Sequence, residues 1–209
     1  NTVVLVRTVH SGSESDVAVA LAAFGAGSMT AALGLPWLLD RTMDRTVMTV
    51  AAALLSALTL AHAFWWLAVE LPGWPILLLL WMMSGLLYSS ILTPSGRLLR
   101  RSSHEEDRAS VFAAQFALSH ACWLVASPFA GWAGENAGLP LTLLILGAIA
   151  LGGAIMALIL WPADDTEVLA HEHPDLPNDH PHIQAHDAEG QHRHVYVIDD
   201  WHREWPRPV

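Results

Sequence analysis

The chain has 209 residues, of which 53% are hydrophobic and 14% are charged, whereas an ordinary soluble domain is roughly 25% charged. Residues 1–162 carry nine acids and seven Arg, a net charge of −2, whereas residues 163–209 carry eleven acids and three Arg, a net charge of −8. The chain therefore joins an apolar body to an acidic, polar tail. It has no Lys and no basic surface typical of a nucleic-acid binder, and its single cysteine, Cys122, excludes a disulfide within the chain.

The first residues, NTVVLV, form a short apolar stretch that is followed by Arg7 and a polar segment. Six residues are too few to span a bilayer. There is also no basic flank with a cleavage site of the kind that marks a signal peptide. We interpret this stretch as the end of a preceding helix, so that the body is expected to be part of a larger bundle.

Five long apolar segments follow, at about 17–39, 47–69, 74–96, 109–133 and 139–161. A helix of about 23 residues is about 34 Å long and crosses a hydrocarbon core of about 30 Å. The alternative, a soluble all-α protein, requires polar faces at the helical period, yet segment 47–69 contains only Thr49, Ser56, Thr59 and His62 as polar side chains. The sequence predicts an all-α membrane protein with residues 1–162 as its transmembrane bundle.

Arg residues set the expected orientation of this bundle. All but one of the body's Arg residues lie in two connectors: Arg41, Arg45, Arg97, Arg100, Arg101 and Arg108. The alternate connectors, 70–74 and 135–140, contain no Arg or Lys, and Arg7 alone stands against the pattern. Because basic loops stay in the cytoplasm, we expect both Arg-bearing connectors and the tail to be cytoplasmic. Within the second connector, Ser103–Glu106 (SHEE) also matches a capping box and predicts a helix start there.

Polar side chains inside a span are candidates for the transport path, because burying them in lipid is costly. Gln115 and Ser119 lie four residues apart and share a helix face, with His120 beside it. A histidine there can relay protons or contact substrate, since its pKa moves easily across neutral pH. The alternative is a histidine that hydrogen-bonds to a neighbouring helix, and packing is the favoured role of His62.

The tail, residues 163–209, is rich in His, Asp and Pro and lacks apolar periodicity, which predicts disorder over most of its length. Residues two apart in an extended chain point to the same side, so each of three H-x-H pairs can chelate a divalent ion such as zinc, nickel, copper or cobalt. The six residues are His171, His173, His180, His182, His192 and His194. The competing interpretation is a solvated spacer without metal. At its end, Trp201 and Trp205 are expected to dock on the membrane or on the body.

The stretch LPWLLDRTMDR resembles the short signature loop of the major facilitator superfamily, with Asp40-Arg41 as its acid–base pair and Arg45 as the trailing base. It departs from the family pattern at Pro36, Met43 and Asp44, and in this it is similar to the weaker copy in the second half of the family's fold. The stretch from Leu92 to about Gly134 also resembles the tenth-to-eleventh helix region of bacterial members.

The resemblance implies the eighth to twelfth helices of a transporter that lies in the bacterial inner membrane and works with its missing N-terminal half. It also implies that Asp40, Arg41 and Arg45 form a conformational latch, whereas the simpler alternative is that the Arg residues only set topology. The expected function is alternating-access, proton-coupled export of a small molecule.

Two alternatives stay open: efflux of a divalent metal such as nickel, cobalt or zinc, and a non-transporting membrane sensor or scaffold with a metal-binding tail. We expect no enzyme, because no nucleophile–base pair or closed ligand set is present. We also expect no cofactor other than a divalent metal on the tail.

Overall fold

The structure, a computed structural model, describes residues 2–162, 168–173, 176–177, 179–185, 187–188 and 191–205; the rest of the predicted tail lies outside the described residues. Its body is built on five long helices: α2 (Glu14–Leu39), α3 (Asp44–Ala68), α4 (Trp74–Arg101), α5 (Arg108–Asn136) and α6 (Leu139–Leu160). Each is long and apolar enough to cross a membrane. The predicted all-α membrane class is therefore confirmed. α2, α4 and α5 run a few residues beyond the predicted spans, whereas α3 begins a few residues earlier than predicted and α6 matches its predicted span to within one residue.

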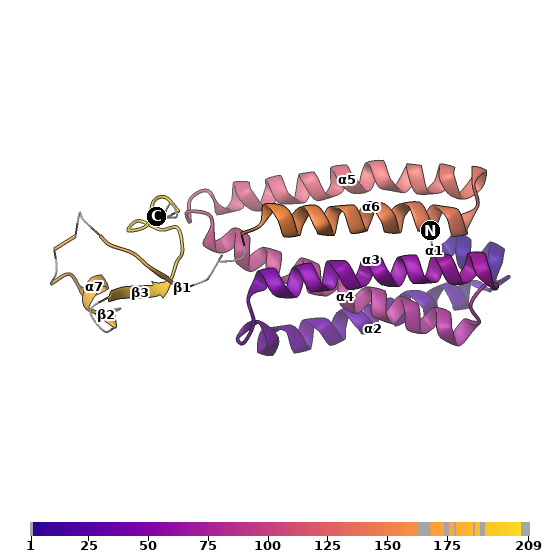
Figure 1. The fold of residues 1–209 in the computed structure, drawn as a ribbon, viewed down its shortest axis with the longest axis horizontal. Helices are drawn as coiled ribbons and strands as arrows, with labels where there is room; N and C mark the ends of the chain where they lie inside the picture. Colours follow the sequence, from indigo (N-terminus) through magenta and orange to yellow (C-terminus); the bar gives the residue numbers. More distant parts are fainter. Residues whose placement is uncertain are drawn as a thin grey trace.

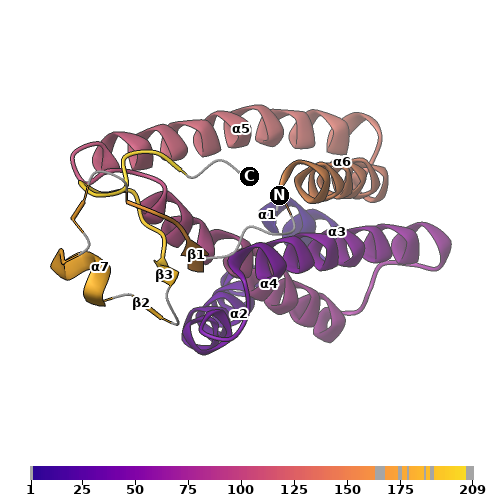
Figure 2. The ribbon, with the colours of Figure 1, turned by 60° about the vertical axis from the view of Figure 1, so that its left-hand side comes forward.

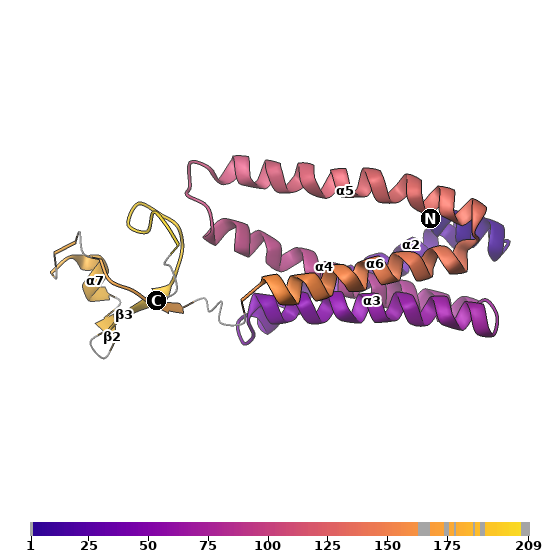
Figure 3. The same ribbon diagram turned by 45° about the horizontal axis from the view of Figure 1, so that its top comes forward.

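The five helices lie alongside one another, and the tail lies beyond one end of the bundle (Figure 1). α4 packs most extensively against α2, and α3 lies between α4 and α6. α5 stands apart from α2 and α3 along most of its length (Figure 3). The loops that carry Arg41 and His104 are at the tail end of the bundle, and the loops without Arg are at the other end, beside α1 (Thr2–Val4).

Glycine makes the contact between α2 and α4 possible. A Cβ on Gly27 would lie 1.8 Å from the carbonyl oxygen of Met82, and one on Gly85 would lie 2.0 Å from that of Phe24. The two backbones therefore touch, and Ser28 Oγ donates a 3.1 Å hydrogen bond to the Gly85 carbonyl across the contact. Small residues allow this close packing, which holds helices together where lipid removes the hydrophobic driving force.

The N-terminal residues fold back against the bundle. α1 runs into one turn of π-helix, η1 (Leu5–Val9), whose Leu5 and Val6 are buried against Ala20 of α2 and Leu77 of α4. A capping box between Ser13 and Asp16 starts α2, and the sequence analysis did not identify it.

The second connector does not form the predicted capping box. Ser103 Oγ donates to the Leu99 carbonyl, at the end of the preceding helix, instead of accepting from residue 106. α5 begins at Arg108 after Asp107, which makes no side-chain cap. The SHEE pattern was misleading because Ser103 closes α4 rather than opening α5.

The described part of the tail contains β1 (Val168–Ala170), α7 (Pro181–Ala185), β2 (Asp187–Ala188) and β3 (Gln191–Val195). The strands form a small antiparallel sheet in the order β1-β3-β2, with Val168 opposite Val195 and Ala188 opposite Gln191. Figure 2 shows this sheet below the tail-side ends of α4 and α5. The sequence predicted no regular structure here, because a sheet of such short strands has no apolar alternation to reveal it.

Candidate functional site

The predicted latch loop has two of its three residues on the surface. Asp40 is exposed and ends α2, with its backbone N–H donating to the Pro36 carbonyl. Arg41 folds back on the same helix, where it donates a 2.8 Å hydrogen bond to the Trp37 carbonyl and its guanidinium lies 4.2 Å from the Trp37 ring. Both of these Arg41 contacts are with Trp37 of α2, the helix that directly precedes it.

Arg45 makes the long-range contacts of this loop. Its Nε donates to the Trp161 carbonyl at 3.0 Å and its Nη2 to the Leu158 carbonyl at 3.2 Å. These carbonyls belong to the C-terminal end of α6, where a cation also complements the helix dipole. Arg45 therefore ties the start of α3 to the end of α6.

Asp44 is the acid of this region that the sequence analysis missed. It lies in the first turn of α3, is 3% exposed and pairs with Arg97 of α4 at 3.6 Å. In the sequence, Asp44 stands out only as a departure from the family loop. Its position was a usable signal, because an acid in the first turn favours a helix N-terminus and the next Arg-bearing connector supplies a partner.

A cavity of about 230 Å³ lies within the bundle, between α2, α3, α4 and α6. Its wall is mostly apolar, with hydroxyls from Thr59 and Ser84 and the imidazole of His62. His62 is buried and stacks on Trp66 with ring centroids 6.1 Å apart, which agrees with its predicted packing role. Its side chain also forms part of the cavity wall. The span residues chosen from sequence do not line this cavity.

Those span residues, Gln115, Ser119 and His120, lie together on α5. Ser119 Oγ donates to the Gln115 carbonyl at 2.8 Å, and His120 Nδ1 lies 2.8 Å from the Phe116 carbonyl. Both Ser119 and His120 are exposed, and among the described residues α5 buries only Ala133. Ser119 and His120 are therefore presented on a helix face that no described helix covers, and the half-buried Gln115 lies beside them.

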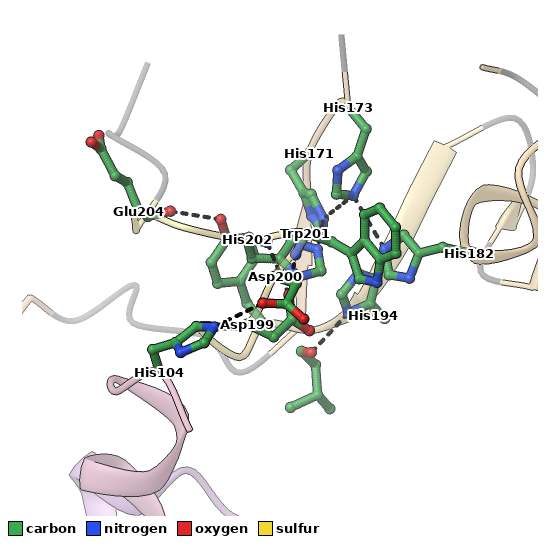
Figure 4. A network of polar contacts seen from close by, with 12 residues as sticks. His104, His171, His173, His182, His194, Asp199, Asp200, Trp201, His202 and Glu204 are labelled. Carbon is green, nitrogen blue, oxygen red and sulfur yellow. Dashed lines mark hydrogen bonds and ion pairs between the residues drawn. The ribbon is translucent and has the colours of Figure 1, made fainter. Parts of the chain in front are cut away.

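Six histidines of the tail converge at one point, with their six candidate ligand atoms within 4.8 Å of one another. They come from the segment after β1, from α7, from β3 and from the turn beyond β3: His171, His173, His182, His192, His194 and His202. Five of the six predicted metal residues are in this cluster. Figure 4 labels four of them, His171, His173, His182 and His194. His180 is not in the cluster, because its ring lies against Trp201, and His202 is an addition that no H-x-H pattern predicted.

Hydrogen bonds hold several of these rings in one tautomer. Nδ1 of His171 lies 3.1 Å from the Leu169 carbonyl, Nδ1 of His194 lies 2.8 Å from the Val195 carbonyl, and Nδ1 of His202 lies 2.7 Å from an Asp199 oxygen. When Nδ1 carries the proton, the lone pair is on Nε2. Such partners are the usual second shell of metal-binding histidines.

Burial also keeps part of the cluster neutral. Loss of solvent, together with the neighbouring imidazoles, lowers the pKa of His171 and of His173 to about 4, although the hydrogen bond to the Leu169 carbonyl opposes the shift at His171. The pKa of Asp199 is lowered as well: burial opposes its ionisation, but hydrogen bonds from His202 and from the backbone of Trp201 and His202 outweigh it. At neutral pH His171 and His173 therefore offer uncharged nitrogen donors, and the Asp199 carboxylate lies beside His202.

The tail contacts the body at the end of α4. The Ile198 N–H donates to the Arg101 carbonyl at 2.8 Å, and His104 Nε2 lies 3.0 Å from an Asp200 oxygen. The Arg101 guanidinium lies 5.3 Å from the Trp205 ring, so that Trp205 docks on the body. Between tail and body is a cavity of about 360 Å³ lined by Asp44, Arg97, Arg100, Arg101, Arg108, Val195 and Val197.

Comparison with known proteins identifies a family for the chain. No curated protein and no solved structure matches the chain. The family profile described as Major Facilitator Superfamily matches residues 2–187, which include all five membrane helices. The chain is therefore a multi-pass membrane protein of the Major Facilitator Superfamily, a family of membrane transporters.

Proposed function

We propose that the chain is part of a secondary active transporter that exports a small molecule by alternating access, with a proton as the coupling ion. The observation that carries the proposal is the family match across the five membrane helices. The binding cavity of such a transporter lies between two half-bundles near the middle of the membrane. The uncovered face of α5 with Gln115, Ser119 and His120 supports this, because polar groups at that depth are expected to face a partner or a water-filled path.

The second half-bundle is part of the proposal: the five helices are the C-terminal half of the fold, and the N-terminal half covers α5. The protein resides in a bacterial inner membrane with its tail in the cytoplasm. The Arg-bearing connectors at the tail end of the bundle support this orientation.

The proton-coupling role of His120 is tested by transport in proteoliposomes made with the full-length transporter. Substrate is first identified from a growth screen against a drug and metal panel, and flux is then followed under an imposed pH gradient. His120→Gln is expected to abolish flux driven by the gradient while leaving substrate exchange without a gradient intact. Cys122→Ser, on the same exposed helix, is the matched control. Unchanged gradient-driven flux in His120→Gln would remove the proton-coupling role.

The latch at the start of α3 is the conformational part of the proposal. Asp40 and Arg41 are on the surface, where a second half-bundle can reach them, and Arg45 already connects α3 to α6. We expect Asp40→Asn to slow turnover while membrane insertion and thermal stability stay at the wild-type level, because Asp40 is exposed. If Asp40→Asn and the wild-type protein have the same turnover, the loop only sets the topology and is not a latch.

A second candidate function is efflux of a divalent metal, and the histidine cluster of the tail is the observation that favours it. Deleting residues 163–209 should then sensitise cells to nickel, cobalt or zinc. Equal growth of the two strains on all three metals argues for a different substrate. The non-transporting sensor remains the alternative of another class, and transport activity in proteoliposomes excludes it.

A further inference from the structure

We propose that the six clustered imidazoles of the tail bind one divalent transition-metal ion, with all six Nε2 atoms as ligands in an octahedral arrangement. This goes beyond the transport function, because the site lies outside the membrane bundle and its metal need not be the transported substrate. The cluster is defined here as His171, His173, His182, His192, His194 and His202.

Hydrogen bonding alone does not account for the arrangement. His171 Nε2 lies 3.1 Å from His173 Nε2 and 3.0 Å from His202 Nε2, and His182 Nε2 lies 3.2 Å from the Nε2 atoms of both His173 and His192. A ring nitrogen has one in-plane site, which is either an N–H or a lone pair. Three of these nitrogens each approach two others, so one proton per nitrogen cannot serve both contacts. A central cation accepts every lone pair at once.

The distances also indicate the coordination number. A metal–nitrogen bond of about 2.1 Å places neighbouring donors about 3.0 Å apart in an octahedron and about 3.4 Å apart in a tetrahedron. The four measured separations are 3.0, 3.1, 3.2 and 3.2 Å. Two of them are closer to the octahedral spacing, two lie midway, and their mean of about 3.1 Å is closer to the octahedral value; the number of donors agrees with it. The site therefore fits Ni²⁺ or Co²⁺, which accept six nitrogen donors, better than a four-coordinate structural Zn²⁺.

The second shell is already in place. Nδ1 of His171, His194 and His202 each has an oxygen partner, which directs the Nε2 lone pairs inward. Asp199 is the only carboxylate among these three partners, and it supplies negative charge beside the imidazole ligands. A site with its outer partners in position is more specific than the flexible H-x-H pairs that the sequence predicted.

Because the ligands come from four segments, the ion also fixes the fold of the tail. His171 and His173 follow β1, while His192 and His194 lie on β3, so one ion joins the two strands that pair. His202 lies between Asp200, which contacts His104, and Trp205, which contacts Arg101. Metal binding is therefore expected to hold the tail against the end of α4.

The experiment uses the full chain in nanodiscs, purified with a tag that contains no histidine. Metal content is measured after equilibrium dialysis against Ni²⁺ or Co²⁺, and the Co²⁺ form is examined by visible absorption. We expect one ion per chain and the weak bands of six-coordinate cobalt. His202→Asn should weaken binding at least about tenfold, the scale on which even outer-shell losses act. His180→Asn, with its ring outside the cluster, should match the wild-type protein.

Independent chelation by H-x-H pairs gives the opposite pattern. Two or three ions bind per chain, His180→Asn loses affinity and His202→Asn keeps it, and any of these results overturns the proposal. Strong four-coordinate cobalt bands overturn the octahedral assignment. Thermal unfolding of the helices in each variant checks that the body is intact, so that a loss of metal binding is assigned to the tail.

Discussion

In the body of this protein many polar side chains contact partners that are close in the sequence, whereas in the tail the contacts join residues that are far apart in the sequence. In the body, hydroxyls such as those of Thr30, Ser56 and Ser84 donate to the carbonyl four residues earlier in their own helix. In the tail, His171 meets His202 from 31 residues away. Local partners let a polar residue sit in a membrane helix without specifying a neighbour. The contacts that leave their own element are therefore those most informative about structure and function.

Among the described residues of the body, such contacts include Asp44–Arg97 and Arg45–Trp161 at its tail end, Ser28–Gly85 at the α2–α4 contact and Trp81–Thr2 near the other end. Three predictions test whether such contacts hold the body together, and whether the tail depends on its metal instead.

The largest effect is expected at the contact of α2 with α4. Gly85→Leu places a side chain where even a Cβ would be 2.0 Å from the Phe24 carbonyl oxygen. Since backbone must move, we expect a loss of about 3 kcal/mol or more in the free energy of unfolding, at or beyond the upper end of ordinary overpacking. Thermal unfolding in detergent measures it. Gly96→Leu on the same helix has nothing within 4 Å of its Cβ and is the control. Equal stability of the two variants would show that α2 and α4 are not in backbone contact.

A smaller effect is expected at the ion pair between α3 and α4. Arg97→Gln leaves the carboxylate of Asp44 buried without this cation, and breaking a fully buried pair costs about 3–5 kcal/mol. Because the Arg97 side chain is 42% exposed, we expect a lower cost of about 1–3 kcal/mol.

Arg100→Gln, at a neighbouring exposed position, should have little effect on stability. The double variant Asp44→Asn with Arg97→Gln should recover part of the loss, and a double-mutant cycle measures the coupling. Additive losses in that cycle would mean that the two side chains do not interact.

The smallest effect is expected in the second shell of the histidine cluster. Asp199→Asn keeps the shape of the side chain but removes the charge that orients His202, which lies 2.7 Å away. We expect Ni²⁺ affinity to fall about tenfold with the stoichiometry unchanged. Asp200→Asn, whose partner is His104 rather than a ligand, should leave the affinity unaltered. A larger loss in Asp200→Asn than in Asp199→Asn would contradict the assigned second shell.

The difference between local and long-range contacts also explains which parts of this structure the sequence predicted. Five apolar segments predicted the five helices, because hydropathy and length are local properties. The position of Asp44 in a first turn was a local signal, but its partner Arg97 lies 53 positions away and is identified only when α3 and α4 are side by side. The capping box at Ser103 was predicted wrongly, since the same serine can end one helix or begin the next.

For the tail, the residue types indicated metal binding, but not its form. The H-x-H spacing identified five of the six clustered histidines, because residues two apart share a side in β3 and in the extended segment after β1. His180 lies outside the cluster because it precedes α7, where the two-residue period no longer holds. His202 has no partner two residues away, and only the fold of the chain brings it to the others.

Hydrogen–deuterium exchange of the full chain, with and without Ni²⁺, tests most directly the claim that the tail depends on its metal and the body does not. We expect added Ni²⁺ to slow exchange of backbone amides in residues 191–202 and at the Ile198 contact with Arg101, while exchange in α2, α3, α4 and α6 stays the same. The same protection should persist in His180→Asn and be absent in His202→Asn. Exchange that is unchanged by Ni²⁺ in the tail, or slowed equally in the tail and the helices, would contradict the account.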